Sequence, residues 1–224
     1  MKPGLPLIAL LLLPSGIVCA QTAATQPRPA AAKPAVLEKK TVPATATAPE
    51  YVQLARNVEV IPNIENAVKT SGVLTHEGLF GPLLFAEHTR AFFLELKPGM
   101  YLEEHPHDLG SIVYTVRGRW VLVSEGKRQV MEAGSLFRFG DKMPTGWEAP
   151  FADGALVLIF KQKVKPETYD SFHQGLKKVQ AEIEAERKKG VPFYYNQLKP
   201  DHPAVMFARS VNPDFDAVLK NIKN

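Results

Sequence analysis

Cysteine is nearly absent from this chain of 224 residues, which has a single copy at Cys19. One thiol cannot form a disulfide within the chain, so a fold held together by disulfides is excluded. An excess of either charge is absent too, since 27 lysines and arginines face 23 aspartates and glutamates and no basic run exceeds three residues. Nucleic acid is therefore not expected as a partner.

A long apolar segment is also missing. The most apolar stretch, Leu5–Leu13, has nine residues, whereas a membrane-spanning helix needs about 20, so we expect no membrane span. The stretch follows Lys2 and precedes small residues that end at Ala20, which is the form of a secretory signal peptide. We expect residues 1–20 to be removed near Ala20 and the mature protein to be exported, to the periplasm or outside the cell. Cleavage would also remove Cys19 and exclude thiol catalysis.

Residues 21–50 have the composition of a linker. Nine Ala, five Pro and five Thr occur among these 30 residues, and such a segment buries too little apolar surface to fold. We expect a disordered tether, with folded structure beginning near Tyr51.

Short strands separated by turn signals dominate the next region. Apolar and polar residues alternate over short runs that end at Gly-containing turns such as Glu125-Gly126 and Asp153-Gly154. The expected strands are Leu83–Glu87, Ala91–Leu96, Tyr101–Glu104, Ser111–Val116, Arg119–Ser124, Lys127–Met131, Ser135–Phe139 and Ala155–Lys161. Eight short strands close most readily into a barrel or jelly roll, because closure removes exposed edges. The pattern therefore predicts an all-β domain over residues 51–164, with Gly78–Pro82 as a turn ahead of its first strand.

Residues 165–224 are expected to form a C-terminal helical extension. Apolar residues recur at intervals of four, three and four, which predicts one helix of about 20 residues with a single apolar face. These residues are Phe172, Leu176, Val179 and Ile183. The face packs either on the barrel or on a second subunit, so a homodimer is one expectation. A proline-containing segment, Val191–Pro213, precedes a last short helix, Asp214–Lys220, that begins at an Asx cap.

Two spacings carry a family resemblance. Gly99 is followed after five residues by His105-Pro106-His107, and Gly118 closes this first motif, while Gly134 and Pro144-Thr145-Gly146 form a second one. Together they resemble the two motifs of the cupin superfamily, over about 80 of the 224 residues. The resemblance implies a cupin-type β-barrel. It also implies a metal ion held by the two histidines, a glutamate of the first motif and a histidine of the second.

Half of the ligand set that the resemblance implies is missing. The glutamate position is Ser111, and the position of the second-motif histidine is Ala149. Zinc takes three or four protein ligands, and non-haem iron takes two histidines and a carboxylate. His105 and His107 alone therefore predict a weak or absent site for a divalent ion such as Fe, Mn or Zn.

Two acidic residues are candidates for the missing carboxylate. Side chains of a strand share a face every second residue, which puts Glu103 on the face of His105 and His107. Glu148 is the alternative, but it points away from the barrel interior if Ala149 points inward, unless a bulge shifts the register.

Other residues near the motifs suggest a pocket. On the cupin resemblance, Ser111, Trp147 and the histidine pair line a cavity suited to a small molecule, with Glu103 beside them. Plain core packing is the other interpretation of Trp147. The four remaining histidines fit no ligand spacing and are expected to be structural or surface residues. They are His76, His88, His173 and His202.

Three functions follow as hypotheses. The first is an exported, non-catalytic cupin that binds a small molecule. The second is a metal-dependent enzyme, an oxygenase or isomerase, that uses His105, His107 and an unaligned carboxylate such as Glu103. The third is a structural or oligomerising module with a vestigial pocket. Site residues must decide among them, since one barrel hosts many functions.

Overall fold

A nine-stranded antiparallel sheet is the main element of the structure, a computed structural model that describes residues 51–222. Its strands lie in the order β3-β4-β5-β11-β7-β10-β6, and β8 and β9 also pair with β7. They span β3 Val73–Thr75, β4 Gly78–Phe85, β5 Thr89–Leu96, β6 His105–Pro106, β7 Ser111–Ser124, β8 Lys127–Glu132, β9 Leu136–Phe139, β10 Pro144–Glu148 and β11 Ala155–Gln162. The expected signal peptide and linker, residues 1–50, lie outside the described residues.

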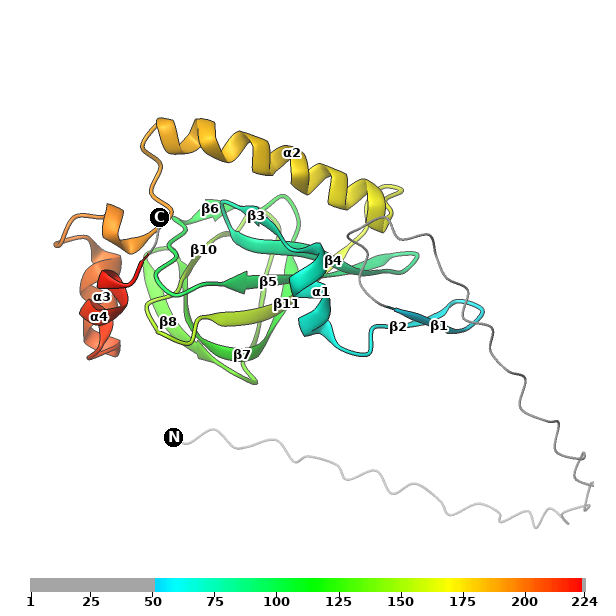
Figure 1. The fold of residues 1–224 in the computed structure, drawn as a ribbon, viewed down its shortest axis with the longest axis horizontal. Helices are drawn as coiled ribbons and strands as arrows, with labels where there is room; N and C mark the ends of the chain where they lie inside the picture. Colours follow the sequence, from blue (N-terminus) through cyan, green and yellow to red (C-terminus); the bar gives the residue numbers. More distant parts are fainter. Residues whose placement is uncertain (1–50, 223–224) are drawn as a thin grey trace, which may run out of the picture. The chain divides into compact units, whose positions relative to one another are not determined.

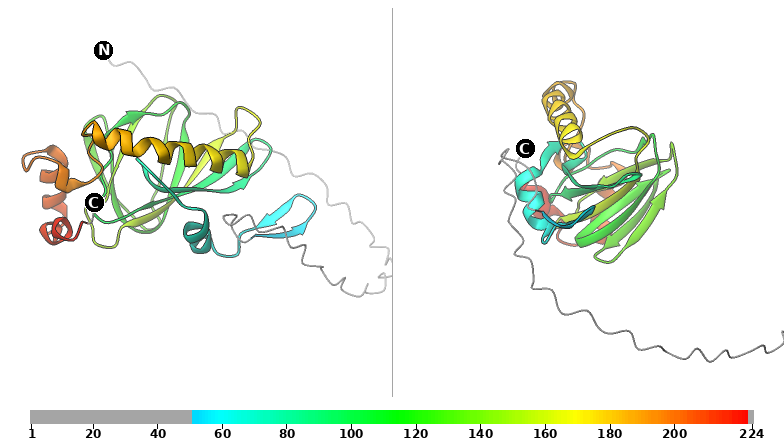
Figure 2. Two further views of the ribbon diagram at one scale, coloured as in Figure 1. Left: turned by 45° about the horizontal axis from the view of Figure 1, so that its top comes forward. Right: turned by 90° about the vertical axis from the view of Figure 1, so that its right-hand side faces the viewer.

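The long strand β7 lets the sheet curl into a barrel (Figures 1 and 2). Its first part pairs with β11 and β9, and its second part with β10 and β8. Between these parts Gly118 has a φ of +77°, and the register against β11 shifts between Leu156 and Val157. A shift of this kind bends a strand and increases its twist. The predicted all-β barrel is confirmed, although Ser111–Val116 and Arg119–Ser124 form one strand and not two.

The barrel interior is a packed apolar core. Alternate residues of β11 point inward, and Val157 and Ile159 belong to the same buried cluster as Trp120. Leu156 faces the other way and is buried in a second cluster with residues of α1 (Ile64–Ser71). Burial on both faces explains why β11 reads as an almost continuous apolar run.

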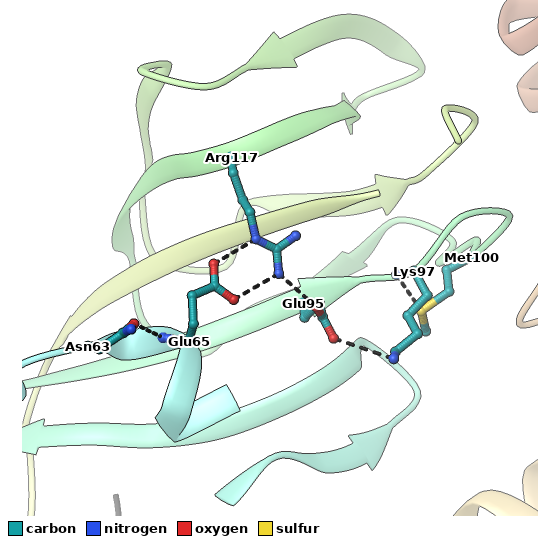
Figure 3. A network of polar contacts seen from close by, with 6 residues as sticks. All are labelled: Asn63, Glu65, Glu95, Lys97, Met100 and Arg117. Carbon is teal, nitrogen blue, oxygen red and sulfur yellow. Dashed lines mark hydrogen bonds and ion pairs between the residues drawn. The ribbon is translucent and has the colours of Figure 1, made fainter. Parts of the chain in front are cut away.

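Helix α1 is fixed to the outside of the barrel at its first turn (Figure 3). The Asn63 side chain caps it by accepting a hydrogen bond of 2.9 Å from the Glu65 N–H. Arg117 of β7 donates two hydrogen bonds to Glu65, at 2.8 and 3.2 Å, and one of 2.8 Å to Glu95 of β5. The Arg117 guanidinium lowers the pKa of Glu65 through these bonds. One arginine thus links the helix to two strands.

Helix α2 (Tyr169–Lys188) is the predicted C-terminal helix, and it lies along the side of the barrel that carries β3 and β4 (Figures 1 and 2). Leu176 and Ile183 of its apolar face are buried. Phe172 stacks on Phe92 of β5 with ring centroids 4.4 Å apart. The face therefore packs on the barrel, and a second subunit is not needed to cover it. Within residues 51–222, no helix has both the length and the apolar character needed to cross a membrane.

The chain after α2 folds against the loop that follows β5. It contains a 3-10 turn (Tyr195–Gln197), α3 (Pro203–Val211) and α4 (Phe215–Lys220), whose buried residues cluster around Tyr101. The last helix was predicted, but the prediction that it begins at an Asx cap is wrong: the Asp214 side chain makes no capping bond, and the Asn212 side chain instead accepts a hydrogen bond from the Asp214 N–H. Barrel and helices lie in one compact unit, so the proposed boundary at residue 164 stays a prediction.

Several elements differ from the sequence predictions. Tyr101–Glu104 is not a strand, since only Tyr101 forms an isolated bridge. Gly78–Pro82 belongs to β4 and is not a turn. Its Gly81 is required by packing, because a Cβ there would lie 2.4 Å from the Phe93 ring. The short elements β1 (Val52–Ala55), β2 (Val58–Val60), α1, β3, β10 and α3 were not predicted.

Candidate functional site

A cavity of about 130 Å³ lies within the barrel. Five polar and six apolar side chains line it, and they come from six strands of the sheet, the loops beside them and α2. The lining consists of Glu77, Arg90, His107, Ser111 and Lys161 together with Phe80, Phe92, Phe139, Trp147, Ile159 and Phe172. A larger hollow of about 280 Å³ lies over Phe137 and Met143, but no acidic or histidine side chain lines it. The smaller cavity therefore carries the chemistry.

Three buried polar atoms on the cavity wall have no hydrogen-bond partner among residues 51–222. They are Ser111 Oγ, Trp147 Nε1 and Arg90 Nε. By contrast, the indole N–H of Trp120, the other tryptophan of the barrel, donates a hydrogen bond of 3.0 Å to Thr115 Oγ1. Each unsatisfied buried group costs about 1–3 kcal/mol. Such groups are rare in folded proteins and need an explanation.

Ser111, Lys161 and Arg90 form a row across three neighbouring strands. Lys161 of β11 lies directly opposite Ser111 of β7 on one side and Arg90 of β5 on the other. Residues directly opposite one another share a face of the sheet, with Cβ atoms about 4.5–5.5 Å apart. We call these three residues the polar row.

The two cations of the polar row have different surroundings. Arg90 forms an ion pair with Glu167, and both side chains are only 13% exposed. Its guanidinium also lies 5.2 Å from the Phe92 ring centroid. The side chain of Lys161 has no ion-pair or hydrogen-bond partner among residues 51–222. Burial lowers the pKa of Lys161. Arg90 thus has a direct ion-pair partner in the described chain, and Lys161 has none.

A second cluster of polar side chains lies at one edge of the cavity. His76 and Glu77, from the turn between β3 and β4, meet His105 of β6. The Nε2 atoms of both histidines lie 4.0 Å from Glu77 Oε1, and one ligand atom from each residue lies within 4.8 Å of the others. Because Glu77 also lines the cavity, the two features adjoin.

The hydrogen bonds of the two histidines suit metal ligation. His105 Nδ1 lies 3.2 Å from the Glu103 carbonyl oxygen. A carbonyl only accepts, so this contact requires a proton on Nδ1 and leaves the Nε2 lone pair directed to Glu77. Metal-binding histidines commonly donate their second nitrogen to a carbonyl in this way. His76 Nδ1 is buried and has no hydrogen-bond partner in the described part of the chain.

His107 lies outside this group of three. Its Nε2 shares a hydrogen bond of 2.7 Å with Thr145 Oγ1, and its ring lies between those of His105 and Phe139 at 4.5 and 4.8 Å. Burial lowers the pKa of His107. The two histidines of the first motif are therefore neighbours with different contacts: His105 lies beside Glu77, and His107 lies in the cavity wall.

The two sequence motifs meet on adjoining strands of the barrel. Strand β6, with His105-Pro106, pairs with β10, which contains Pro144-Thr145-Gly146, and Thr145 lies opposite His105. The barrel and the placement of its motifs are those that the resemblance implied. The fold is therefore similar to that of cupins.

Three solved structures illustrate the likeness, each at low identity. An RmlC-like cupin from Shewanella frigidimarina is 19% identical, covering 38% of this chain and 76% of its own, with a TM-score of 0.35. The cupin domain of an XRE-family transcriptional regulator from Enterobacter cloacae is 18% identical, covering 38% and 96%, with a TM-score of 0.35. The polyketide cyclase RemF from Streptomyces resistomycificus is 14% identical, covering 49% and 87%, with a TM-score of 0.37. No family model and no curated protein matches the sequence.

The residues proposed from the cupin motifs fall in different places. Ser111 and Trp147 line the cavity, whereas Glu103 is exposed and does not. Glu148 is fully buried on the other face of β10, where Arg128 and the Tyr195 hydroxyl bind it. The carboxylate sought at Glu103 or Glu148 is therefore supplied beside His105 by a different residue.

Sequence reasoning missed that residue, Glu77, and its neighbour His76, which was interpreted as structural or surface. The adjacent His-Glu pair was visible, but the motif spacing did not include it. It also missed Lys161. Strand alternation in the sequence could have indicated that Lys161 points into the barrel. Val157, Ile159 and Lys161 share a face of β11, and the first two are buried in the core.

Proposed function

We propose that this cupin binds a small molecule in the barrel cavity. The unpartnered buried atoms Ser111 Oγ and Trp147 Nε1 carry this proposal, because a ligand that accepts hydrogen bonds would satisfy both. An apolar cavity of about 150 Å³ holds a benzene molecule. At about 130 Å³ the cavity suits a ligand of similar size, about six non-hydrogen atoms.

The test uses neutral probes and a variant that fills the cavity. Saturation-transfer NMR with phenol and with butyramide is expected to detect binding to the wild-type protein and to Ser210→Leu, a control on the exposed surface of α3. Ser111→Leu is expected to abolish binding, because its side chain occupies the cavity. Binding that survives in Ser111→Leu, or no binding of either probe to the wild type, would contradict the proposal.

A second candidate function is metal-dependent catalysis, favoured by the arrangement of His76, Glu77 and His105. Two imidazoles and one carboxylate are the ligands that non-haem iron and catalytic zinc use. Ligand atoms bonded at about 2.0–2.2 Å lie closer together than the 4.0 Å seen here. The side chains would therefore have to rotate so that their ligand atoms move closer together for binding. A bound divalent ion would polarise a ligand oxygen in the adjoining cavity.

Metal binding is tested with a matched surface pair. His88 lies 3.5 Å from Glu87 on the exposed surface, so His88→Ala removes a histidine from an equivalent but solvated His-Glu pair. Titration calorimetry with Zn²⁺ and Mn²⁺ is expected to give about one site per chain in the wild type and in His88→Ala. His76→Ala and Glu77→Gln are expected to weaken it at least about tenfold. Equal affinity in Glu77→Gln, or no binding to the wild type, would refute the site.

Export and self-association belong to the same proposal. The signal-like residues 1–20 support export to the periplasm or outside the cell, with a mature chain that starts at Gln21. N-terminal sequencing of the protein recovered from its producing cells tests this, and an intact Met1 would refute it. The homodimer stays a prediction, which light scattering of the purified protein would decide.

A further inference from the structure

We propose that the cavity selects small carboxylic acids, whose carboxylate is held by Lys161 and Ser111 of the polar row. This inference rests on the proposed binding function and specifies its ligand.

Lys161 occupies a position where the strand pattern calls for an apolar residue. The inward face of β11 carries Ala155, Val157 and Ile159, all in the buried core, before it reaches Lys161. Inward-pointing charges can protect an exposed sheet edge from aggregation. That reason does not apply here, because β11 is paired on both sides, with β5 and β7. A half-buried ammonium group with no direct ion pair in the described chain therefore lacks a structural explanation.

The neighbours of Lys161 leave room for an anion. Ser111, directly opposite, has a buried hydroxyl without a partner. Arg90, opposite on the other side, is already paired with Glu167. A carboxylate placed between Lys161 and Ser111 would accept one charge-assisted and one neutral hydrogen bond. A neutral carbonyl ligand would leave the ammonium charge uncompensated.

The other residues that line the cavity determine the chemistry of the ligand beyond its carboxylate. Glu77 is the one acidic side chain among the described residues of the cavity wall. Its charge opposes the lowering of the Lys161 pKa by burial, but its carboxylate lies beside His76 and His105 and forms no ion pair with Lys161. Two residues along the strands from Lys161 and Arg90, Ile159 and Phe92 lie opposite each other on the same face and line the cavity. The carboxylate thus meets polar groups while the body of the ligand meets apolar ones. A short-chain acid of about six non-hydrogen atoms fits both.

A matched pair of probes tests the inference. Butyrate and butyramide have the same number of non-hydrogen atoms and differ in charge. NMR titration is expected to show that the wild-type protein and the exposed-surface control Lys127→Met bind butyrate about tenfold more tightly than butyramide, since a hydrogen bond to a charged group is worth more than a neutral one. Lys161→Met is expected to remove the preference while its butyramide affinity stays within about twofold. Lys161→Arg, which keeps the charge, is expected to retain the preference and guards against misfolding of the Met variant.

The outcomes separate this inference from the function beneath it. Equal affinity for both probes in the wild type would overturn the carboxylate assignment and leave small-molecule binding intact. A preference that persists in Lys161→Met would overturn the role of the lysine. A third outcome would refute the inference alone: phenol binds to the wild type, Ser111→Leu abolishes that binding, and butyrate does not bind. Failure of phenol, butyramide and butyrate together would refute both.

Discussion

The buried ion pair between Arg128 of β8 and Glu148 of β10 is expected to be sensitive to removal of one partner. Glu148 is fully buried, and Arg128 is 13% exposed. The guanidinium lies 3.0–3.3 Å from the carboxylate, and the Tyr195 hydroxyl donates a further bond of 3.1 Å. Arg128→Met would leave a carboxylate with one hydrogen bond in an apolar setting.

The expected loss follows from burial. Breaking a buried pair by removing one partner costs about 3–5 kcal/mol, whereas replacing both partners by neutral groups is often tolerated. In a domain of this size about 2–4 °C of melting temperature corresponds to each kcal/mol, so Arg128→Met should melt roughly 6–20 °C below the wild type. The double variant Arg128→Met/Glu148→Gln should recover most of this loss.

The loss should also depend on pH. Burial raises the pKa of Glu148 above its ordinary value of 4.5, and Arg128 opposes the rise. A carboxyl with a raised folded-state pKa binds its proton more tightly when folded, so stability falls as pH rises through that pKa. Arg128→Met removes the opposing charge and raises the pKa further. Its destabilisation should therefore be larger at about pH 8 than at about pH 5.

Urea unfolding of four proteins at both pH values measures these expectations. These four are the wild type, Arg128→Met, Glu148→Gln and the double variant. A fifth protein, Arg138→Met on the exposed face of β9, is the control for loss of an arginine. A double variant as unstable as Arg128→Met would show that the unpaired carboxylate is not the cause. Equal losses at the two pH values would refute the pKa argument.

Two further variants test the barrel and its cover. Gly118→Ala should cost about 3 kcal/mol or more, because its Cβ would lie 1.9 Å from the Gly154 carbonyl oxygen, whereas Gly126→Ala, also at positive φ but with open space, should cost about 1 kcal/mol. Equal unfolding free energies in urea would contradict this. Phe172→Ala, which removes the ring stacked on Phe92, should cost about 2 kcal/mol and increase acrylamide quenching of tryptophan fluorescence. Unchanged quenching would show that α2 does not cover the cavity.

Most of the barrel could be predicted from sequence because its signals are local. Alternation and flanking glycines placed Ala155–Lys161 within one residue of β11, and the apolar spacing from Phe172 to Ile183 located α2. Both patterns depend only on residues that are neighbours along the chain. Strand β3, with three residues, is too short to show such a period.

The candidate site was harder to predict, because its residues are distant in sequence. His76 and Glu77 reach His105 only through the pairing of β3 with β4 and the curvature that brings β6 nearby. No periodicity encodes that contact. The cupin motifs directed attention to residues within the motifs, and Glu103, the nearest acid on the same strand face, was preferred to an acid that the fold delivers from elsewhere.

The departures from the cupin motifs make physical sense together. A glutamate at the position of Ser111 would lie opposite Lys161 and form an ion pair with it, which would close the polar row to an anionic ligand. With serine there, the ammonium keeps its charge for a ligand, and the carboxylate beside His105 comes from Glu77 on a separate turn. Metal and carboxylate would then be held by different residues. Lys161→Met should weaken the binding of butyrate and retain the binding of Zn²⁺. His76→Ala should weaken the binding of Zn²⁺ and retain the preference for butyrate over butyramide. Loss of both ligands in either variant would show that the two clusters act as one site.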